Sequence, residues 1–176
     1  LLDEEDMSWE DSWAITQKSI AFTNHTVMPE ALECWPLNML REFLPRQLEI
    51  IEEIDRRHLN FLQKRPLMKA DFLEKVAIIS KGPSPEIRMA HIAAVSCFSI
   101  NGVAELHTRL LKEQVFPEFF SLFPEKFSNK TNGISFRRWG MLANPELADL
   151  FDSVLGKNWT RDGETLSGLE ALRDDG

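Results

Sequence analysis

The stretch Ile20-Ala21-Phe22-Thr23-Asn24-His25-Thr26 decides the fold class of this chain. Its apolar start is typical of a short buried strand, and the polar cluster from Thr23 to Thr26 marks the strand's carboxyl end. In open α/β sheets, ligands bind outside the carboxyl ends of the strands. We therefore expect an α/β fold with a site at this point, and His25 is the first candidate site residue.

Most of the remaining chain has the apolar spacing of amphipathic or buried helices, with a period of three to four residues. We expect the segment itself to be predominantly α-helical. The helices are predicted over residues 9–20, 45–65, 72–79, 87–98, 103–111 and 145–155. The last of these begins after Asn144 as N-cap, has Pro145 in its first turn and ends at Gly156. On the 45–65 helix, we interpret the face that carries Asp55 and three glutamates as solvated surface.

The charge and composition exclude several classes of partner. The 176 residues include 20 Lys+Arg against 28 Asp+Glu, which gives a net charge of −8. Because no basic block is present, we expect no nucleic-acid partner. The most apolar stretch, 92–100, is far shorter than the ~20 residues that cross a bilayer, so we expect no membrane insertion. Cys34 and Cys97 stand alone, without a CxxC motif, which fits free thiols in a reducing compartment such as the cytoplasm.

No motif for metal, nucleotide or serine-hydrolase chemistry is present in the sequence. We therefore expect no metal site and no catalytic group within this chain. His58, His91 and His107 lie within predicted helices, and we interpret each as a satisfied core or surface histidine. His25 differs from them because it lies in a polar cluster at the end of an apolar strand.

Two further places are candidates for a ligand. The dipeptide Asn101-Gly102 precedes a predicted helix, whose free amides bind polar or anionic groups, although a plain turn fits the spacing equally well. Between 127 and 139 the helical periodicity disappears. Side-chain amides, a hydroxyl and Trp139 are close together in the sequence of this segment. Such a set suits a sugar, because hydroxyl groups need paired donors and acceptors and a ring packs on a flat apolar surface. A capped turn is the alternative.

The composition break near 130 predicts a domain boundary, with 1–131 and 132–176 on its two sides.

Read in chain order, five separated segments resemble the α-glucan phosphorylases, the glycogen and starch phosphorylase family. The likeness runs from about Trp9 to Leu155 with the spacing intact, which is more specific than any one motif. The segments are FTNHTVMPEALE (22–33), LPR (44–46), RMAH (88–91), NGVA (101–104) and KTNGI (130–134).

The resemblance implies a two-domain glycosyltransferase of the GT-B type, with Rossmann-like domains that face each other across a cleft. Residues 1–131 would be the carboxy-terminal part of its first domain, and 132–176 the start of its cofactor-binding domain. The implied reaction transfers a terminal glucosyl unit from an α-1,4-glucan to orthophosphate and yields glucose 1-phosphate with retained configuration. It uses pyridoxal phosphate, whose phosphate group exchanges protons with the substrate phosphate, so that a catalytic carboxylate pair is not needed.

The resemblance also assigns roles to four positions. His25 and Val103 match residues that contact the glucosyl unit, and Asn132 matches an asparagine that hydrogen-bonds a sugar hydroxyl. Trp139 matches an aromatic residue that packs near the pyridoxal cofactor. The family's Schiff-base lysine and phosphate-binding residues belong to segments outside this chain, so Lys130 does not take that role. We therefore expect the segment alone to be inactive.

The sequence thus predicts a piece of a longer polypeptide, since it begins at Leu1 without an initiator Met. The family implies a cytoplasmic homodimer, or a plastid enzyme if the chain is of the plant type. The alternative is a non-catalytic helical module that keeps the scaffold for glucan or partner binding. It would bind sugar without pyridoxal phosphate.

Overall fold

A computed structural model describes residues 1–66 and 68–173, which divide into two compact units. Unit 1 is Leu1–Thr131, and unit 2 begins at Asn132. Both are mostly helical, and only unit 1 contains strands among the described residues. In the described part of the chain, no helix is both long enough and apolar enough to cross a membrane.

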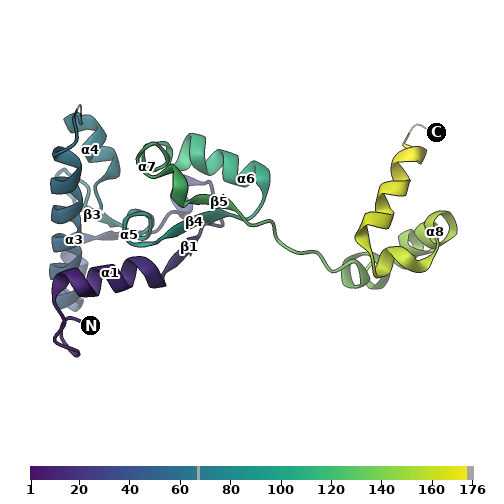
Figure 1. The fold of residues 1–176 in the computed structure, drawn as a ribbon, viewed down its shortest axis with the longest axis horizontal. Helices are drawn as coiled ribbons and strands as arrows, with labels where there is room; N and C mark the ends of the chain where they lie inside the picture. The colour runs from purple at the N-terminus through teal and green to yellow at the C-terminus, as the bar shows by residue number, and fades with distance from the viewer. Residues whose placement is uncertain (67, 174–176) are drawn as a thin grey trace. The chain divides into compact units, whose positions relative to one another are not determined.

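Unit 1 is built from helices around two small sheets (Figure 1). Its α-helices are α1 (Trp9–Ser19), α2 (Leu37–Phe43), α3 (Pro45–Gln63), α4 (Ala70–Val76), α5 (Met89–Ser96), α6 (Glu105–Leu110) and α7 (Pro117–Leu122). Its strands are β1 (Ala21–Thr23), β2 (Cys34–Pro36), β3 (Glu86–Arg88), β4 (Ser99–Gly102) and β5 (Phe127–Asn129). A π-helical turn, η2 (Leu111–Val115), and the 3₁₀ turns η1 (Pro29–Ala31) and η3 (Pro124–Lys126) complete it.

The larger sheet has the order β1-β4-β5, and both of its pairings are parallel. Helical crossovers join β1 to β4 and β4 to β5, as parallel strands require. In the view of Figure 1, α6 and α7 lie above this sheet and α1 lies below it. The smaller sheet pairs β2 with β3 antiparallel. The strand expected near Ile20–Asn24 is confirmed as β1, and the expectation of a predominantly helical segment is confirmed as well.

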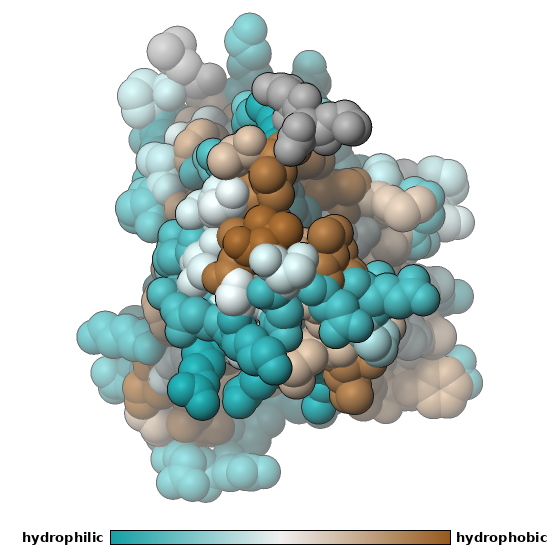
Figure 2. Space-filling view, turned by 90° about the vertical axis from the view of Figure 1, so that its right-hand side faces the viewer, coloured by the Kyte–Doolittle hydropathy of each residue, from teal (hydrophilic) through white to brown (hydrophobic). Residues whose placement is uncertain are grey.

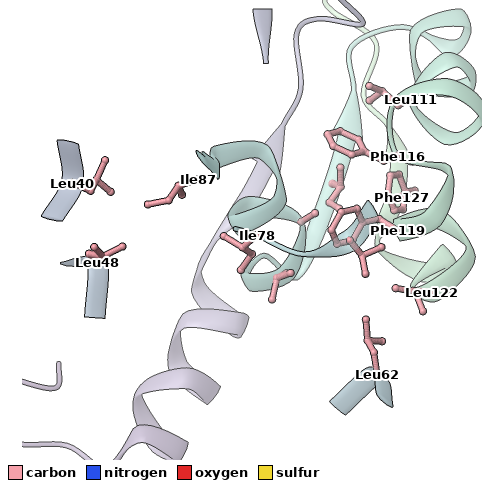
Figure 3. Close-up of a cluster of buried hydrophobic side chains, with 14 residues drawn as sticks. Leu40, Leu48, Leu62, Ile78, Ile87, Leu111, Phe116, Phe119, Leu122 and Phe127 are labelled. Carbon is pink, nitrogen blue, oxygen red and sulfur yellow. The ribbon is translucent and has the colours of Figure 1, made fainter. Parts of the chain in front are cut away.

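The core of unit 1 joins the sheet to α3, α5 and α7. Figure 3 shows Phe116, Phe119 and Phe127 close together, with Leu62 of α3 approaching them. Phe116 and Phe119 meet edge to face, with ring centroids 6.2 Å apart. Offset or edge-to-face aromatic pairs of this kind contribute about 1 kcal/mol beyond their buried area.

Two predicted helix boundaries are wrong, and β-pairing explains both. The predicted 87–98 helix begins at Met89, because Ile87 belongs to β3 and pairs with Trp35. The predicted 72–79 helix ends at Val76, since Ile79 forms a bridge to Ile87. Such pairings depend on residues outside the segment itself and leave no helical or alternating pattern locally.

The prediction that Asp55 of α3 lies on a solvated face is also wrong. Asp55 is buried rather than solvated, and its carboxylate accepts a hydrogen bond of 2.6 Å from the Ile78 backbone N–H. Burial raises the pKa of Asp55 above its ordinary value, although that hydrogen bond acts in the opposite direction. Asp55 therefore holds the residues after α4 against α3.

Unit 2 is a small helical cluster around one tryptophan. It contains a π-helical turn η4 (Arg137–Leu142), α8 (Pro145–Leu155) and the 3₁₀ turns η5 (Lys157–Thr160) and η6 (Gly163–Leu172). Trp159 is fully buried, donates from Nε1 to Asp152 Oδ1 at 2.9 Å and meets Phe151 edge to face. On the side of α8, Figure 2 shows hydrophobic surface gathered between hydrophilic side chains.

Candidate functional site

The carboxyl ends of β1, β4 and β5 meet at one edge of the parallel sheet. Thr23 lies opposite Asn101, and Gly102 lies opposite Asn129. The polar cluster after β1, the Asn-Gly pair at the end of β4 and the loop after β5 therefore leave the sheet side by side (Figure 1). These are the three places that the sequence marks as ligand candidates, and this edge is where open α/β sheets bind ligands.

Asn101 and Gly102 together connect the three strand ends by hydrogen bonds. Its side-chain Oδ1 accepts from Thr23 Oγ1 at 2.8 Å, and its backbone carbonyl accepts from Asn24 N at 3.0 Å. The Gly102 carbonyl accepts from both Asn101 Nδ2 and Lys130 N, each at 3.0 Å. Asn101 is buried, so these bonds are shielded from water and fix the positions of all three loops.

His25 lies at the tip of the loop that follows β1. Asn24 is buried, and its Oδ1 accepts from Thr26 N at 2.8 Å, which forms a tight Asx-type turn around His25. The His25 side chain itself is exposed and forms no hydrogen bond with the described residues. Its hydrogen-bonding groups are therefore available to a ligand.

Val103 is held by a histidine four residues later. The Val103 N–H donates to His107 Nδ1 at 3.1 Å, and α6 begins only at Glu105, two residues beyond the predicted helix start. The Val103 amide is thus already engaged, so the expectation that free amides here bind a ligand fails at this residue. Among the described residues His107 Nε2 is buried without a partner, so the histidine is not the satisfied one we expected.

Gly102 is required by the close approach of α6 to β4. A Cβ at this position would lie 2.8 Å from Thr108 Cα and 2.9 Å from Thr108 N, both backbone atoms. Thr108 also donates from Oγ1 to Asn129 Oδ1 at 3.2 Å, which links α6 to the end of β5. A side chain at 102 would push α6 away from the sheet.

The other two predicted site residues belong to unit 2. Asn132 opens this unit and is exposed. Trp139 lies in η4, and its side chain is 66% exposed. The structure therefore places His25 and Val103 on neighbouring loops of unit 1 and leaves the side chains of Asn132 and Trp139 open on unit 2.

Metal chemistry finds no support in the described residues. No group of three or more His, Cys, Asp or Glu side chains within 1–66 and 68–173 is arranged to hold an ion. Cys34 is exposed, Cys97 is buried, and both are free thiols.

Sequence reasoning missed the role of His107, although its spacing of four residues from Val103 at a helix start was a usable signal.

Comparison with known proteins gives a consistent result over the whole chain. A family model described as "Carbohydrate phosphorylase" matches residues 1–176. A glycogen phosphorylase of Synechocystis is 45% identical over 174 residues, covering 99% of this chain and 20% of the relative. The brain form of rat glycogen phosphorylase is 43% identical and the H isozyme of wheat alpha-glucan phosphorylase 41% identical, each over 99% of this chain. The chain spans about one fifth of the length of these relatives.

Proposed function

Since the chain belongs to the carbohydrate phosphorylase family, we propose that the full-length protein is an α-glucan phosphorylase of the glycogen and starch type. It transfers a terminal glucosyl unit from an α-1,4-glucan to orthophosphate and releases glucose 1-phosphate. The full-length protein has two Rossmann-like domains of the GT-B type. Unit 1 belongs to the first domain and unit 2 begins the second.

The observation that carries this proposal is the edge formed by β1, β4 and β5. His25 and Val103, which match glucosyl-contacting residues of the family, leave the sheet on adjacent loops that Asn101 holds together. A sugar needs fixed donors and acceptors at several hydroxyl groups, and loops anchored to a parallel sheet provide such fixed positions.

Each site residue has a distinct part in binding. The Asn24 turn fixes the backbone of His25, so the His25 main chain contacts the glucosyl unit in a defined position. The His25 side chain remains available for a further contact. Because His107 occupies the Val103 N–H, the remaining polar group of Val103 is its carbonyl. This carbonyl accepts no bond among the described residues and is available to a sugar hydroxyl. Asn132 is exposed and supplies an amide that both donates and accepts.

Trp139 fits a pyridoxal phosphate site in its chemistry. Its flat, largely exposed indole ring can pack against the planar pyridine ring of the cofactor. Arg137 and Arg138 precede it in sequence and can bind an anionic group such as the cofactor phosphate. When bound, the cofactor supplies a phosphate group that donates and accepts the proton exchanged with orthophosphate. The lysine that would hold its aldehyde is expected in segments beyond this chain. Unit 2 therefore orients the cofactor rather than binding it covalently.

The proposed protein acts as a homodimer in the cytoplasm, or in a plastid if it is of the plant type. Its partners are the α-1,4-glucan and orthophosphate. The segment of 176 residues contributes glucosyl and cofactor contacts and is inactive by itself, because the residues that hold the transferred phosphate lie elsewhere.

Replacement of Asn132 tests the proposal in the full-length protein. Asn132→Ala leaves one sugar hydroxyl without its partner, a loss of about 1–3 kcal/mol of transition-state stabilisation. We expect kcat/KM for phosphorolysis to fall by about 5- to 150-fold. Asn60→Ala, at an exposed position on α3, is the matched control and should leave kcat/KM unchanged. Equal rates for Asn132→Ala and the wild type would contradict the assignment.

A further inference from the structure

A cavity of about 680 Å³ lies in unit 1, away from the sheet edge described above. It is lined by residues of α1, of the second half of α3, of the end of α5 and of the segment that leads into β5. None of the residues that connect the three strand ends lines it. Its volume falls within the roughly 300–1,000 Å³ of small-molecule sites.

Aromatic side chains form much of the wall. They come from three separate parts of the chain and are Trp9, Trp13, Phe61 and Phe123. Trp9 and Trp13 lie one helical turn apart on α1, so both face the same side of that helix. The Arg57 guanidinium lies over the Trp9 ring, 4.7 Å from its centroid, so Trp13 is the better candidate to pack against a planar apolar group.

The cavity concentrates positive charge in a chain whose net charge is −8. Four cationic side chains line it and only one carboxylate, Glu10. Arg56 and Arg57 already bond to Glu53 at 2.6 Å, and Arg57 also bonds to Glu10 at 2.9 Å. The other two cations, Lys64 and Lys126, form no ion pair within the described residues. Charge that is not compensated by the protein is available to an anionic ligand.

Lys126 is held in place by the end of α5. Its Nζ donates to the carbonyls of Ala94 at 3.1 Å and Val95 at 3.3 Å, in the last turn of that helix. The ammonium group also lies over the Phe123 ring, 4.9 Å from its centroid, and one of its three N–H donors remains beyond the two carbonyl bonds. Burial lowers the pKa of Lys126, which shows that its charge is poorly solvated. A bound anion would compensate that charge.

His58 forms part of the same wall. The residue is only 7% exposed, and its Nε2 has no hydrogen-bond partner among the described residues. Burial lowers the pKa of His58 to about 4, so the ring is neutral at physiological pH. Because that atom has almost no accessible surface, His58 closes the wall of the cavity and does not contact the ligand through Nε2.

We propose that this cavity binds a small planar aromatic molecule that carries an anionic group, such as an aryl phosphate. The aromatic ring packs against Trp13, and the anionic group lies at Lys64 and Lys126. The site is separate from the glucosyl site and does not depend on the proposed reaction.

Calorimetric titration of the full-length protein with 1-naphthyl phosphate tests the proposal. Saturating glucose 1-phosphate and orthophosphate are present, so that phosphate-binding groups of the reaction site are occupied. We expect saturable binding that quenches tryptophan fluorescence, whereas uncharged 1-naphthol binds at least tenfold more weakly. Lys64 is exposed, so Lys64→Gln should not disturb the fold. This variant should bind 1-naphthyl phosphate at least fivefold more weakly than the wild type. Lys126→Gln should do the same.

The matched control is Lys18→Gln, an exposed lysine of α1 that does not line the cavity. Its affinity for 1-naphthyl phosphate should equal that of the wild type. The proposal is overturned by an absence of binding at millimolar ligand, or by Lys64→Gln binding as tightly as Lys18→Gln. A structure of the full-length protein with another segment of its chain inside the cavity would overturn it equally.

Discussion

At the scale of single residues, Asn101 organises the candidate site more than any residue assigned to the sugar itself. One buried amide connects β1 to β4, and the Gly102 carbonyl that it bonds also receives the Lys130 N–H. The polar residue types at this edge could be recognised in the sequence. Their mutual bonds could not, because Thr23 and Asn101 are 78 positions apart and meet only through strand pairing.

Gly102→Ala should disturb this edge strongly. The added methyl group would lie 2.8–2.9 Å from backbone atoms of Thr108, which cannot move without shifting α6. We expect a loss of about 1–3 kcal/mol in stability and a raised KM for glucan in the full-length protein. Thermal unfolding and initial-rate kinetics measure the two effects. Gly133→Ala has open space around its Cβ and is the control for stability; an equal Tm for both variants would count against this packing.

The buried titratable residues of α3 show where sequence reasoning reaches its limit. His58 lies on the apolar face as expected, but Asp55 lies three positions earlier and is buried as well. A charged residue between other charged residues is normally solvated. Only the Ile78 N–H, brought there by the segment after α4, explains why this carboxylate is inside.

At the scale of elements, local signals predicted long or well-capped helices and missed short strands. The helix α3 was predicted from its apolar spacing and the two prolines that bound it, and both limits agree with the structure to within two residues. The strands β2 to β5 are only three or four residues long. Segments of that length show too few alternations to reveal a period, and they exist because a partner strand lies beside them.

The helix α8 is the best case of local prediction. Asn144 caps it by accepting from Leu147 N at 3.2 Å, Pro145 occupies its first turn, and Gly156 follows with a φ of 72°. Each of these features was expected from residue type alone. The agreement shows that this helix is specified by its own sequence.

Asn144→Ala should therefore weaken unit 2 by a predictable amount. The N–H of Leu147 loses its acceptor, which costs about 1 kcal/mol for a cap of this kind. Amide hydrogen exchange in the first turn of α8 should quicken about fivefold, while α3 exchanges as before. Asn144→Ser keeps an acceptor oxygen and should behave like the wild type. If amides of α8 exchange as slowly in Asn144→Ala as in Asn144→Ser, the cap is not a stabilising contact.

At the scale of the whole molecule, all four histidines belong to unit 1 and none to unit 2. Burial lowers the pKa of both His58 and His91 to about 4. Their unfolded pKa is about 6.5, so the unfolded chain binds more protons between these values. The stability that neutral histidines provide is present above pH 6.5 and is lost as the pH falls towards 4.

This linkage predicts that acid loosens unit 1 before unit 2. The full effect is on the order of 3 kcal/mol for each histidine, and the raised pKa of Asp55 acts in the opposite direction. Hydrogen exchange of the full-length protein at pH 7.5 and 5, corrected for the intrinsic rate, should show faster opening of α3 and α5. Peptides of α8 provide the internal control. Equal changes in α3 and α8 would show that the buried histidines do not govern acid stability.

The division into two units was expected from composition near residue 130, and the structure divides the chain between Thr131 and Asn132. The assignment of these units to two domains of a phosphorylase stays a prediction. The family itself could be recognised from five short segments, because their order and spacing carry more information than their residue types. The comparisons support the family over all 176 residues.

The formation of glucose 1-phosphate by the purified full-length protein tests the central claim most directly. Glucan and orthophosphate are supplied, and the cofactor is removed and then restored on the same preparation. We predict that glucose 1-phosphate forms, that its formation stops without pyridoxal phosphate, and that it returns when pyridoxal phosphate is added. A full-length protein that binds glucan and carries the cofactor but forms no glucose 1-phosphate would contradict the proposed function.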